Sequence, residues 1–389
     1  MNTKFIYNVP TKVYFGEDYL DNLAPELAKF GKRVLLVYGG GSIKSSGLYD
    51  KVVGEIKSGG LELFECSGIE PNPRLTSVKR GAETCKKENV DVILAVGGGS
   101  VIDAAKMIGA AALYDGDPWD FPSKKAKIEK CLPVLTVLTL SATGTEMNGN
   151  SVISNMDTNE KRGAASPLFL PKVSFLDPAN TYSVDQFQTA SGSADIMSHV
   201  MEVYFYLQDE MFMLDKMMEG LMKTVMKYAP IAMADPTNYE ARANLMWASS
   251  WAINGFVQGG KPKNWSCHPM EHALSAYYDV THGLGLAIIT PKWMEYVLDE
   301  SNVRKFYQFG CNVFDLDENE DPMVVAKQSI EKLSDFFINT LKLQSSFTQL
   351  GIDDSKFEDM AKSACVGGSI NGMKLLNVDD VVEIYKMCL

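Results

Sequence analysis

The residue types best suited to chemistry are concentrated in few places in this chain. The sequence contains only four histidines, and His268, His272 and His282 lie within one stretch of fifteen residues. The fourth, His199, follows Asp195 by four residues. Imidazole nitrogens and carboxylate oxygens are ligands that divalent transition metals accept in proteins. This concentration predicts a metal site that is assembled from separate segments of the chain.

The spacing of these residues supports that prediction. Asp195 and His199 are four residues apart, as are His268 and His272, so each pair is expected to project from one face of a helix. Asp195, His199, His268 and His282 would complete a set of four ligands, which leaves His272 over. Three imidazoles and one carboxylate suit Fe²⁺, Zn²⁺ or Co²⁺. The alternative is that the histidines are unrelated residues of the core or the surface.

Two glycine runs in the first half predict contacts with the phosphate of a ligand. Gly39-Gly40-Gly41-Ser42 follows the apolar segment 33–38, and Gly97-Gly98-Gly99-Ser100 follows the apolar segment 91–96. Glycine allows the backbone to approach a ligand closely, and the start of a following helix offers N–H groups to phosphate. Neither run matches GxGxxG or a P-loop, so tight turns without a ligand remain an alternative. A third loop, at residues 139–146, offers hydroxyl groups either to a cofactor or as a helix cap.

The helices and strands that must position these residues differ between the two halves of the chain. In the first half, short apolar segments at 33–38, 61–66, 91–96, 133–138 and 173–176 alternate with amphipathic segments such as 75–88 and 101–113. This alternation is typical of a parallel sheet with helices on both faces, which binds ligands at the carboxyl ends of its strands.

After about residue 182 the strand signals stop, and apolar residues recur at three- and four-residue intervals. The expected helices span residues 194–206, 211–228, 239–253, 269–278, 284–298, 322–341, 356–366 and 379–388. The predicted organisation is an α/β domain at residues 1–181, which carries the glycine runs, followed by an all-helical metal-binding domain at residues 182–389.

Composition narrows the class of protein further. The chain has 389 residues, enough for two domains, and its formal net charge of −12 argues against nucleic-acid or anionic-membrane partners. It lacks an apolar run of roughly 18 residues and a signal-peptide pattern. Seven scattered cysteines without a CxxC pair indicate a reduced, cytoplasmic protein. Cys267, beside His268, could add a thiolate ligand, although buried structural thiols are more common.

Taken together, these motifs resemble one known family. The matching segments extend over essentially the whole chain, at residues 10–16, 38–42, 70–73, 95–103, 142–146, 194–199 and 268–283. The chain resembles the iron-containing (group III) alcohol dehydrogenases, and within them the branch of butanol dehydrogenases and NADPH-dependent aldehyde reductases. The resemblance implies an N-terminal Rossmann-like, dinucleotide-binding domain and a C-terminal helical domain, as in dehydroquinate synthase-like folds, and a homodimer.

The resemblance also implies roles for individual residues. Asp195, His199, His268 and His282 match the metal ligands, and His272 matches a further histidine near the nicotinamide. The positions that match cofactor contacts are Gly39, Gly40, Gly41, Ser42, Asn72, Gly97, Gly98, Gly99, Ser100, Asp103, Thr139, Thr143 and Lys161. The positions that match the substrate pocket are Asn150, Ser151 and Asn264.

The residues after the first apolar segment bear on the choice of cofactor. NAD-preferring members of the family commonly have an acidic residue there, which pairs with the ribose 2′-OH and repels a 2′-phosphate. This chain has Gly39, followed by Ser42 and Lys44, which could hold a phosphate. We therefore expect NADP(H) to be favoured, with NAD(H) as a second cofactor.

The expected function is that of a metal-dependent alcohol dehydrogenase or aldehyde reductase. An Fe²⁺ or Zn²⁺ ion would act as a Lewis acid while hydride moves between NAD(P)H and a short-chain alcohol or aldehyde of the butanol type. His272, which is not needed as a ligand, would relay the proton as the catalytic residue. The alternatives are a glycerol or other polyol dehydrogenase, a dehydroquinate synthase-like lyase and a non-catalytic binding protein. The lyase is disfavoured because the expected pocket segments offer few cations for a phosphorylated substrate.

Overall fold

The computed structural model describes residues 4–206, 211–260 and 265–389, which divide into two units. One unit consists of Asn8–Asp185 and Asp235–Ser250. The other consists of the residues up to Tyr7, Gln186–Ala234 and Trp251–Leu389. The boundary between two sequence domains that we expect at residues 181 and 182 remains a prediction.

The first unit is built on a sheet of six parallel strands. Their order across the sheet is β1, β8, β5, β4, β2, β3, with the bounds Lys12–Phe15, Val173–Leu176, Val134–Leu138, Val92–Gly97, Arg33–Tyr38 and Glu62–Cys66. The five strands expected from apolar segments are confirmed to within one residue at each end. The edge strand β1 is additional.

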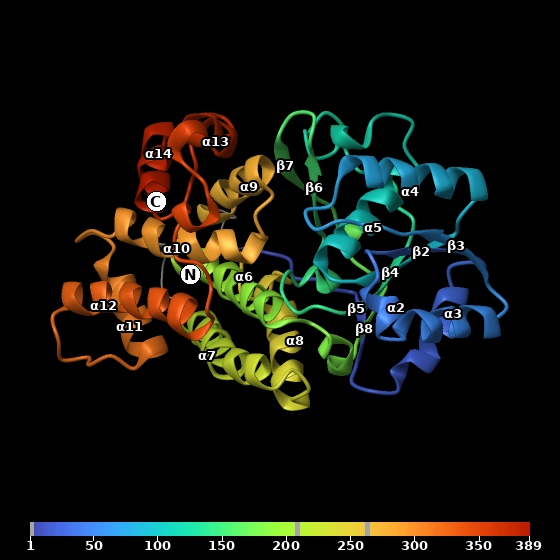
Figure 1. Ribbon diagram of the computed structural model, residues 1–389, viewed down its shortest axis with the longest axis horizontal. Coiled ribbons are helices and arrows are strands. Elements are labelled where there is room, and N and C mark those ends of the chain that lie inside the picture. The colour runs from blue at the N-terminus through green and yellow to red at the C-terminus, as the bar shows by residue number, and fades with distance from the viewer. Residues whose placement is uncertain (1–3, 207–210, 261–264) are drawn as a thin grey trace. The chain divides into compact units, whose positions relative to one another are not determined.

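Helices cover both faces of this sheet (Figure 1). In β2, Leu35 and Val37 belong to one buried core, whereas Val34 and Leu36 belong to the other, because successive side chains point to opposite faces. The helices that complete the first core are α4 and α5, at Leu75–Glu88 and Gly99–Ala111. Those that complete the second are α1 and α3, at Leu23–Ala28 and Leu48–Ser58. The expected doubly covered parallel sheet is therefore confirmed.

Three further elements belong wholly or mainly to this unit. The short helix α2 spans Ser42–Ser45, directly after the first glycine run. An antiparallel hairpin, β6 (Asn150–Asn155) and β7 (Glu160–Ala165), forms a second sheet that the sequence did not predict. Helix α8 spans Tyr239–Ile253 and adds Met246 to the core that α4 and α5 share.

The second unit is helical, as expected. Its helices α6, α7, α9, α10, α11, α12, α13 and α14 span Gln186–Tyr204, Phe212–Ala234, Cys267–Tyr278, His282–Val297, Val303–Phe314, Pro322–Asp335, Phe357–Ala364 and Val378–Met387. Helix α11 was not predicted, and α12 continues into a π-helical turn at Phe336–Thr340. Helix α10 packs against both α6 and α9, so the three helices that carry the histidines are neighbours.

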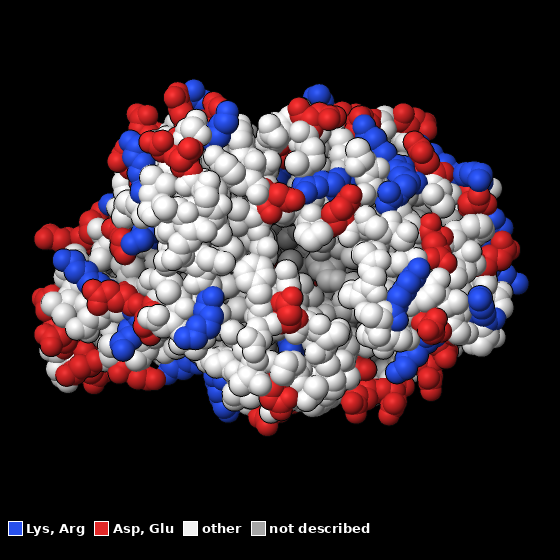
Figure 2. All heavy atoms as spheres, viewed as in Figure 1, with Lys and Arg blue, Asp and Glu red and all other residues white. Residues whose placement is uncertain are grey.

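The surface carries charges of both signs. On the face shown in Figure 2, Lys and Arg side chains are interspersed among Asp and Glu side chains. Among the described residues, no helix combines the length and the apolar character that crossing a membrane would require.

Candidate metal centre

Three helices position the histidines and Asp195. Asp195 lies in the middle of α6, which is buried from Thr189 to Tyr204, and His199 lies one turn further on. Helix α10 approaches α6 closely enough that a Cβ on Gly283 would lie 1.8 Å from the carbonyl oxygen of Ser191. The glycine after His282 is therefore a packing requirement, because any side chain there would push the start of α10 away from α6.

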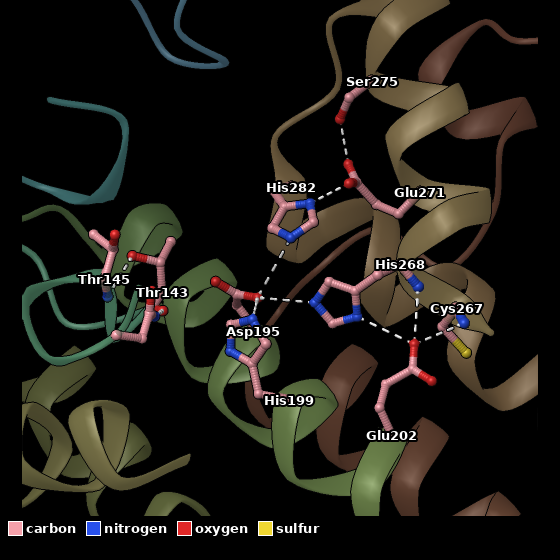
Figure 3. A network of polar contacts seen from close by, with 11 residues as sticks. Thr143, Thr145, Asp195, His199, Glu202, Cys267, His268, Glu271, Ser275 and His282 are labelled. Atoms are coloured by element: carbon pink, nitrogen blue, oxygen red, sulfur yellow. Dashed lines mark hydrogen bonds and ion pairs between the residues drawn. The ribbon is translucent and has the colours of Figure 1, made fainter. Parts of the chain in front are cut away.

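One carboxylate oxygen lies at the centre of this arrangement. The Nε2 atoms of His199, His282 and His268 lie 3.5, 3.6 and 3.9 Å from Oδ1 of Asp195. Figure 3 shows the three rings arranged around the Asp195 carboxylate. Two ligands of a tetrahedral ion with bonds of about 2.1 Å are about 3.4 Å apart. The observed separations are thus close to those between ligands of one ion.

The polar atoms of the site fit a cation. Nε2 of His268 is buried and has no hydrogen-bond partner within the described structure, and the same holds for Nδ1 of His199. Burial, with a smaller contribution from His268 and His282, holds the pKa of His199 well below its usual value, so its ring is neutral. Buried polar atoms are normally hydrogen-bonded. A metal ion would supply the partner that the Nε2 lone pair of His268 lacks.

His272 lies beside this group. A second set of possible ligand atoms, on Glu271, His272 and His282, lies within 4.8 Å of one another. The ring centre of His272 is 5.5 Å from that of His282 and 6.2 Å from that of His268. His272 is thus close to the expected ligands without lying among the atoms that face Asp195 Oδ1, which suits the role of a proton relay.

Cys267 and Trp265 lie shortly before His268 in the sequence, but neither is placed as a metal ligand. The Cys267 thiol is buried, and burial raises its pKa well above the usual value. Figure 3 shows its sulfur beyond Glu202, on the side away from Asp195. The Trp265 ring lies edge-on to His268, with 4.3 Å between ring centres. Cys267 is therefore a buried structural thiol, and Trp265 forms part of the apolar wall around His268.

Sequence reasoning did not single out two buried glutamates that contact the histidines. Glu202 lies on α6, seven residues after Asp195, and Glu271 lies on α9, three residues after His268. Both intervals return to the same helix face. The helical spacing therefore indicates the face on which each glutamate lies, but not that its carboxylate is buried.

The glycine runs lie where the sequence predicts them in the first unit. The run at Gly39 connects β2 to α2, and the run at Gly97 connects β4 to α5. Gly98, the residue before α5, has no side chain that could cap the helix. The first N–H groups of α5 are therefore suited to a phosphate. A Cβ on Gly99 would lie 2.3 Å from Oγ1 of Thr143. Only glycine allows the 139–146 loop to approach the start of this helix so closely.

Several other expected contact residues are engaged within the protein. Asp103 accepts hydrogen bonds from Oγ1 of Thr145 at 2.5 Å and from the Val152 amide at 2.9 Å. Ser151 is fully buried and donates to the Asp103 carbonyl. The Asn150 carbonyl accepts from Lys106. Asn264 lies outside the described residues. Direct contacts of Asp103, Asn150 and Ser151 with ligands stay predictions.

Two of the remaining cofactor positions follow strands of the main sheet, and the third lies in the hairpin. Asn72 has a positive φ of 52° in the loop between β3 and α4. Thr139 follows β5, and its amide donates to the Gly97 carbonyl. Lys161 is buried in β7 of the hairpin. Cofactor contacts from these residues also stay predictions.

Comparison with known proteins identifies the family. The model described as "Iron-containing alcohol dehydrogenase" matches residues 10–178, and that of the C-terminal region of the Fe-containing alcohol dehydrogenase family matches residues 189–389. NADH-dependent butanol dehydrogenase B of Clostridium acetobutylicum is 50% identical over 98% of both chains. NADPH-dependent aldehyde reductase YqhD of Escherichia coli is 34% identical over 92% of both.

Solved structures agree with this result. The crystal structure of NADH-dependent butanol dehydrogenase A from Thermotoga maritima superposes with a TM-score of 0.95 and 39% identity, over 99% of this chain and 98% of that one. This chain belongs to the iron-containing alcohol dehydrogenase family. It is an oxidoreductase of the alcohol dehydrogenase and aldehyde reductase class, which uses a nicotinamide cofactor and a metal ion. The expected fold and class of enzyme are confirmed.

Proposed function

We propose that Asp195, His199, His268 and His282 hold one divalent metal ion, Fe²⁺ or Zn²⁺. The observation that carries this proposal is the approach of three histidine Nε2 atoms to within 3.9 Å of the same Asp195 oxygen. Three imidazoles and one carboxylate would complete a tetrahedral shell, so a substrate oxygen would have to bind as a fifth ligand. A metal bound there supplies a Lewis acid for a carbonyl or hydroxyl oxygen.

The protein's own part in the reaction is to move a proton. We propose His272 as the catalytic residue that supplies the hydroxyl proton of the product alcohol in reduction, or takes the hydroxyl proton from the substrate alcohol in oxidation. It is half-buried, near both His268 and His282, and its side chain is not needed for the ligand set. Imidazole is the side chain that most often serves as a general acid or base in enzymes.

The first unit would bind the nicotinamide cofactor, which supplies or accepts the hydride. The runs Gly39–Ser42 and Gly97–Ser100 follow adjacent parallel strands, and the 139–146 loop follows the next strand in the sheet. We propose that the N–H groups at the start of α5 contact the pyrophosphate. Thr139, Thr143, Asn72 and Lys161 are proposed as further contacts.

We propose that both NADPH and NADH are accepted. No acidic residue occurs in the segment 39–47, and Lys44 is held 5.2 and 4.7 Å from the ring centres of Tyr38 and Tyr49. Ser42 and Lys44 would suit a 2′-phosphate. The names of the 50% identical relatives support NADH, whereas that of the 34% identical reductase supports NADPH.

The substrates proposed are short-chain primary alcohols and aldehydes of the butanol type. The support is the names of the relatives that match nearly the full chain. Asn150, Ser151 and Asn264 are proposed to line the substrate pocket. A homodimer and a cytoplasmic location are further proposals, and the seven free thiols of the protein support a reducing compartment.

The test is a set of initial-rate assays with four substrates. Butyraldehyde and propionaldehyde would be assayed with NADPH or NADH, and glycerol and 1,3-propanediol with NADP⁺ or NAD⁺. Butyraldehyde should give the highest kcat/KM, and both reduced cofactors should work. Ser42→Asp should lower kcat/KM for NADPH by roughly tenfold through repulsion of the 2′-phosphate and leave that for NADH nearly unchanged. Preference for glycerol would replace the proposed substrate class, and equal losses with both cofactors would refute the proposed phosphate contact.

A further inference from the structure

Two buried carboxylates beside the histidines have no role in the function proposed above. The side chains of Glu202, on α6, and Glu271, on α9, are 3% and 0% exposed. Buried glutamates are rare in proteins unless they are paired. Each of these two faces the Nδ1 atom of a different histidine, on the side of the ring away from Asp195 (Figure 3).

Glu202 connects α6 to the start of α9. It accepts hydrogen bonds from the backbone amides of Ser266, Cys267 and His268, at 2.7, 2.7 and 2.9 Å. Its Oε1 also lies 3.1 Å from Nδ1 of His268. A carboxylate that accepts three N–H groups acts as an acceptor, so the nitrogen of His268 that faces it is the protonated one. Nε2 of His268 then keeps its lone pair for the ion.

Glu271 makes the corresponding connection between α9 and α10. One of its oxygens is in close contact with Nδ1 of His282, and the other accepts from the Ser275 hydroxyl. Ser275 also lies 2.9 Å from the carbonyl oxygen of Val280, in the turn that precedes His282. The Glu271 carboxylate is therefore fixed by its own helix while it orients the ring of a residue on the next helix.

These contacts bear on the tautomers of His268 and His282, which the choice of ligands alone does not determine. A neutral histidine has two tautomers, and only the one with hydrogen on Nδ1 presents Nε2 as a ligand. Asp195 and His199 are held in register by their shared helix, whereas His268 and His282 come from two other helices. It is these two rings, and not His199, that have a glutamate at Nδ1.

We infer that Glu202 and Glu271 are positioning residues that fix the tautomer and orientation of His268 and His282 for metal binding. This inference rests on the proposed ligand set. Through the two glutamates, the three helices that carry ligands are connected in the order α6, α9, α10. Hydrogen bonds of this kind to ligand imidazoles commonly change metal affinity by 10–100-fold when they are removed.

The experiment compares Ala and Gln variants of both glutamates in the full chain, stripped with a chelator. Co²⁺ titration would be followed by its visible absorption bands, and Zn²⁺ affinity by competition with a chromophoric chelator. Glu202→Ala and Glu271→Ala should weaken binding about 10–100-fold and alter the Co²⁺ bands. Glu271→Gln should restore much of the loss, because its amide oxygen still accepts from His282 Nδ1 while its NH₂ group donates to Ser275.

Glu219→Gln is a matched control in the same unit. Glu219 is buried at 4% exposure and bonds to Tyr204 and Asn312, away from the histidines. This variant should lower the unfolding temperature of the apo protein and leave the metal affinity unchanged. If the glutamates were only structural, Glu271→Ala would, like Glu219→Gln, lower the unfolding temperature without changing the metal affinity. That result would show the inference to be wrong. If Glu202→Ala does not fold, the two Glu271 variants still give this comparison.

His282→Ala separates this inference from the proposed function. If the wild type binds Co²⁺ and His282→Ala binds it equally well, the proposed ligand set is wrong. If His282→Ala loses the ion while Glu271→Ala binds it like the wild type, the ligand set stands and the positioning role is refuted.

Discussion

At the scale of single residues, the site depends on one oxygen atom. Asp195 Oδ1 faces three imidazole nitrogens that come from three helices. The limited number of histidines and their i, i+4 spacing predict most of this arrangement, because one helix face brings such pairs together. The roles of Glu202 and Glu271 could not be assigned in the same way, since a glutamate in a helix is usually a solvated residue and its burial depends on tertiary packing.

His272→Ala should lower kcat by about 10²–10⁴-fold while metal content stays at the wild-type level. The reason is that His272 contributes a proton but no ligand in the proposed division of roles. Steady-state rates and metal analysis of the same preparation test it together. A variant that had lost its metal would place His272 among the ligands instead.

Gly99→Ala should weaken NADPH binding and destabilise the protein. The new Cβ would lie 2.3 Å from Thr143 Oγ1, so the 139–146 loop or the start of α5 must move. NADPH fluorescence titration measures the loss of affinity. Gly54→Ala, in α3, is the control because no heavy atom lies within 4 Å of its added Cβ. Unchanged NADPH affinity in Gly99→Ala would argue against this loop as the phosphate site.

At the scale of elements, the sequence predicted those that carry strong apolar periodicity. The five apolar strands of the main sheet were found, but the β6–β7 hairpin was missed because its segments resemble polar loops. Ser151 is buried in β6, where its hydroxyl donates to the Asp103 carbonyl, and the sequence does not reveal this contact. Helix α11, in contrast, had a readable signal in the spacing of Phe306, Phe309 and Val313.

Lys106→Met should destabilise the first unit by about 3 kcal/mol, as loss of one partner from a buried charged cluster commonly does. Lys106 is fully buried, and burial lowers its pKa to about 8. Its ammonium lies 2.6 Å from Thr145 Oγ1 and 2.8 Å from the Asn150 carbonyl, which connects α5 to the 139–146 loop and to β6.

Urea unfolding would measure this loss of free energy. Lys79→Met is the control, because the Lys79–Asp117 pair is exposed and worth at most about 1 kcal/mol. An equal effect of the two substitutions would show that the buried ammonium contributes no more than a surface ion pair.

Glu26→Gln should show a pH-dependent loss of stability. Burial raises the pKa of Glu26, but hydrogen bonds from Lys12, Lys29 and Tyr14 outweigh it and hold the pKa at about 2, below the ordinary 4.5. A lowered pKa stabilises the fold above pH 4.5, and this contribution is lost as the pH falls towards 2. Because the two lysines are exposed, the difference at pH 7 should be only about 1–2 kcal/mol.

Unfolding free energies of wild type and Glu26→Gln at several pH values test this linkage. The difference between them should shrink steadily below pH 4.5. Glu62→Gln, whose carboxylate is 58% exposed beside Arg33, should show a smaller difference throughout. A difference for Glu26→Gln that does not change with pH would refute the assigned pKa.

At the scale of the whole molecule, the alternation of apolar segments and the later helical periodicity predicted an α/β region and a helical region. Physical pattern alone did not distinguish an alcohol dehydrogenase from other enzymes with the same two kinds of unit. The motifs made this distinction through the family resemblance. They include glycines such as Gly99 and Gly283, whose positions the close packing of the structure explains. Cofactor preference, which we propose depends on residues such as Ser42, was not decided by the fold.

The most direct test of the central claim measures metal content and butyraldehyde reduction on the same samples. Wild type and Asp195→Ala would be stripped of metal, reloaded anaerobically with Fe²⁺ or Zn²⁺, and assayed with NADPH and NADH. The proposed function predicts one ion per wild-type chain, with activity proportional to its occupancy, and neither ion nor activity in Asp195→Ala. Full activity in metal-free wild type, or an unchanged ion content in Asp195→Ala, would contradict it.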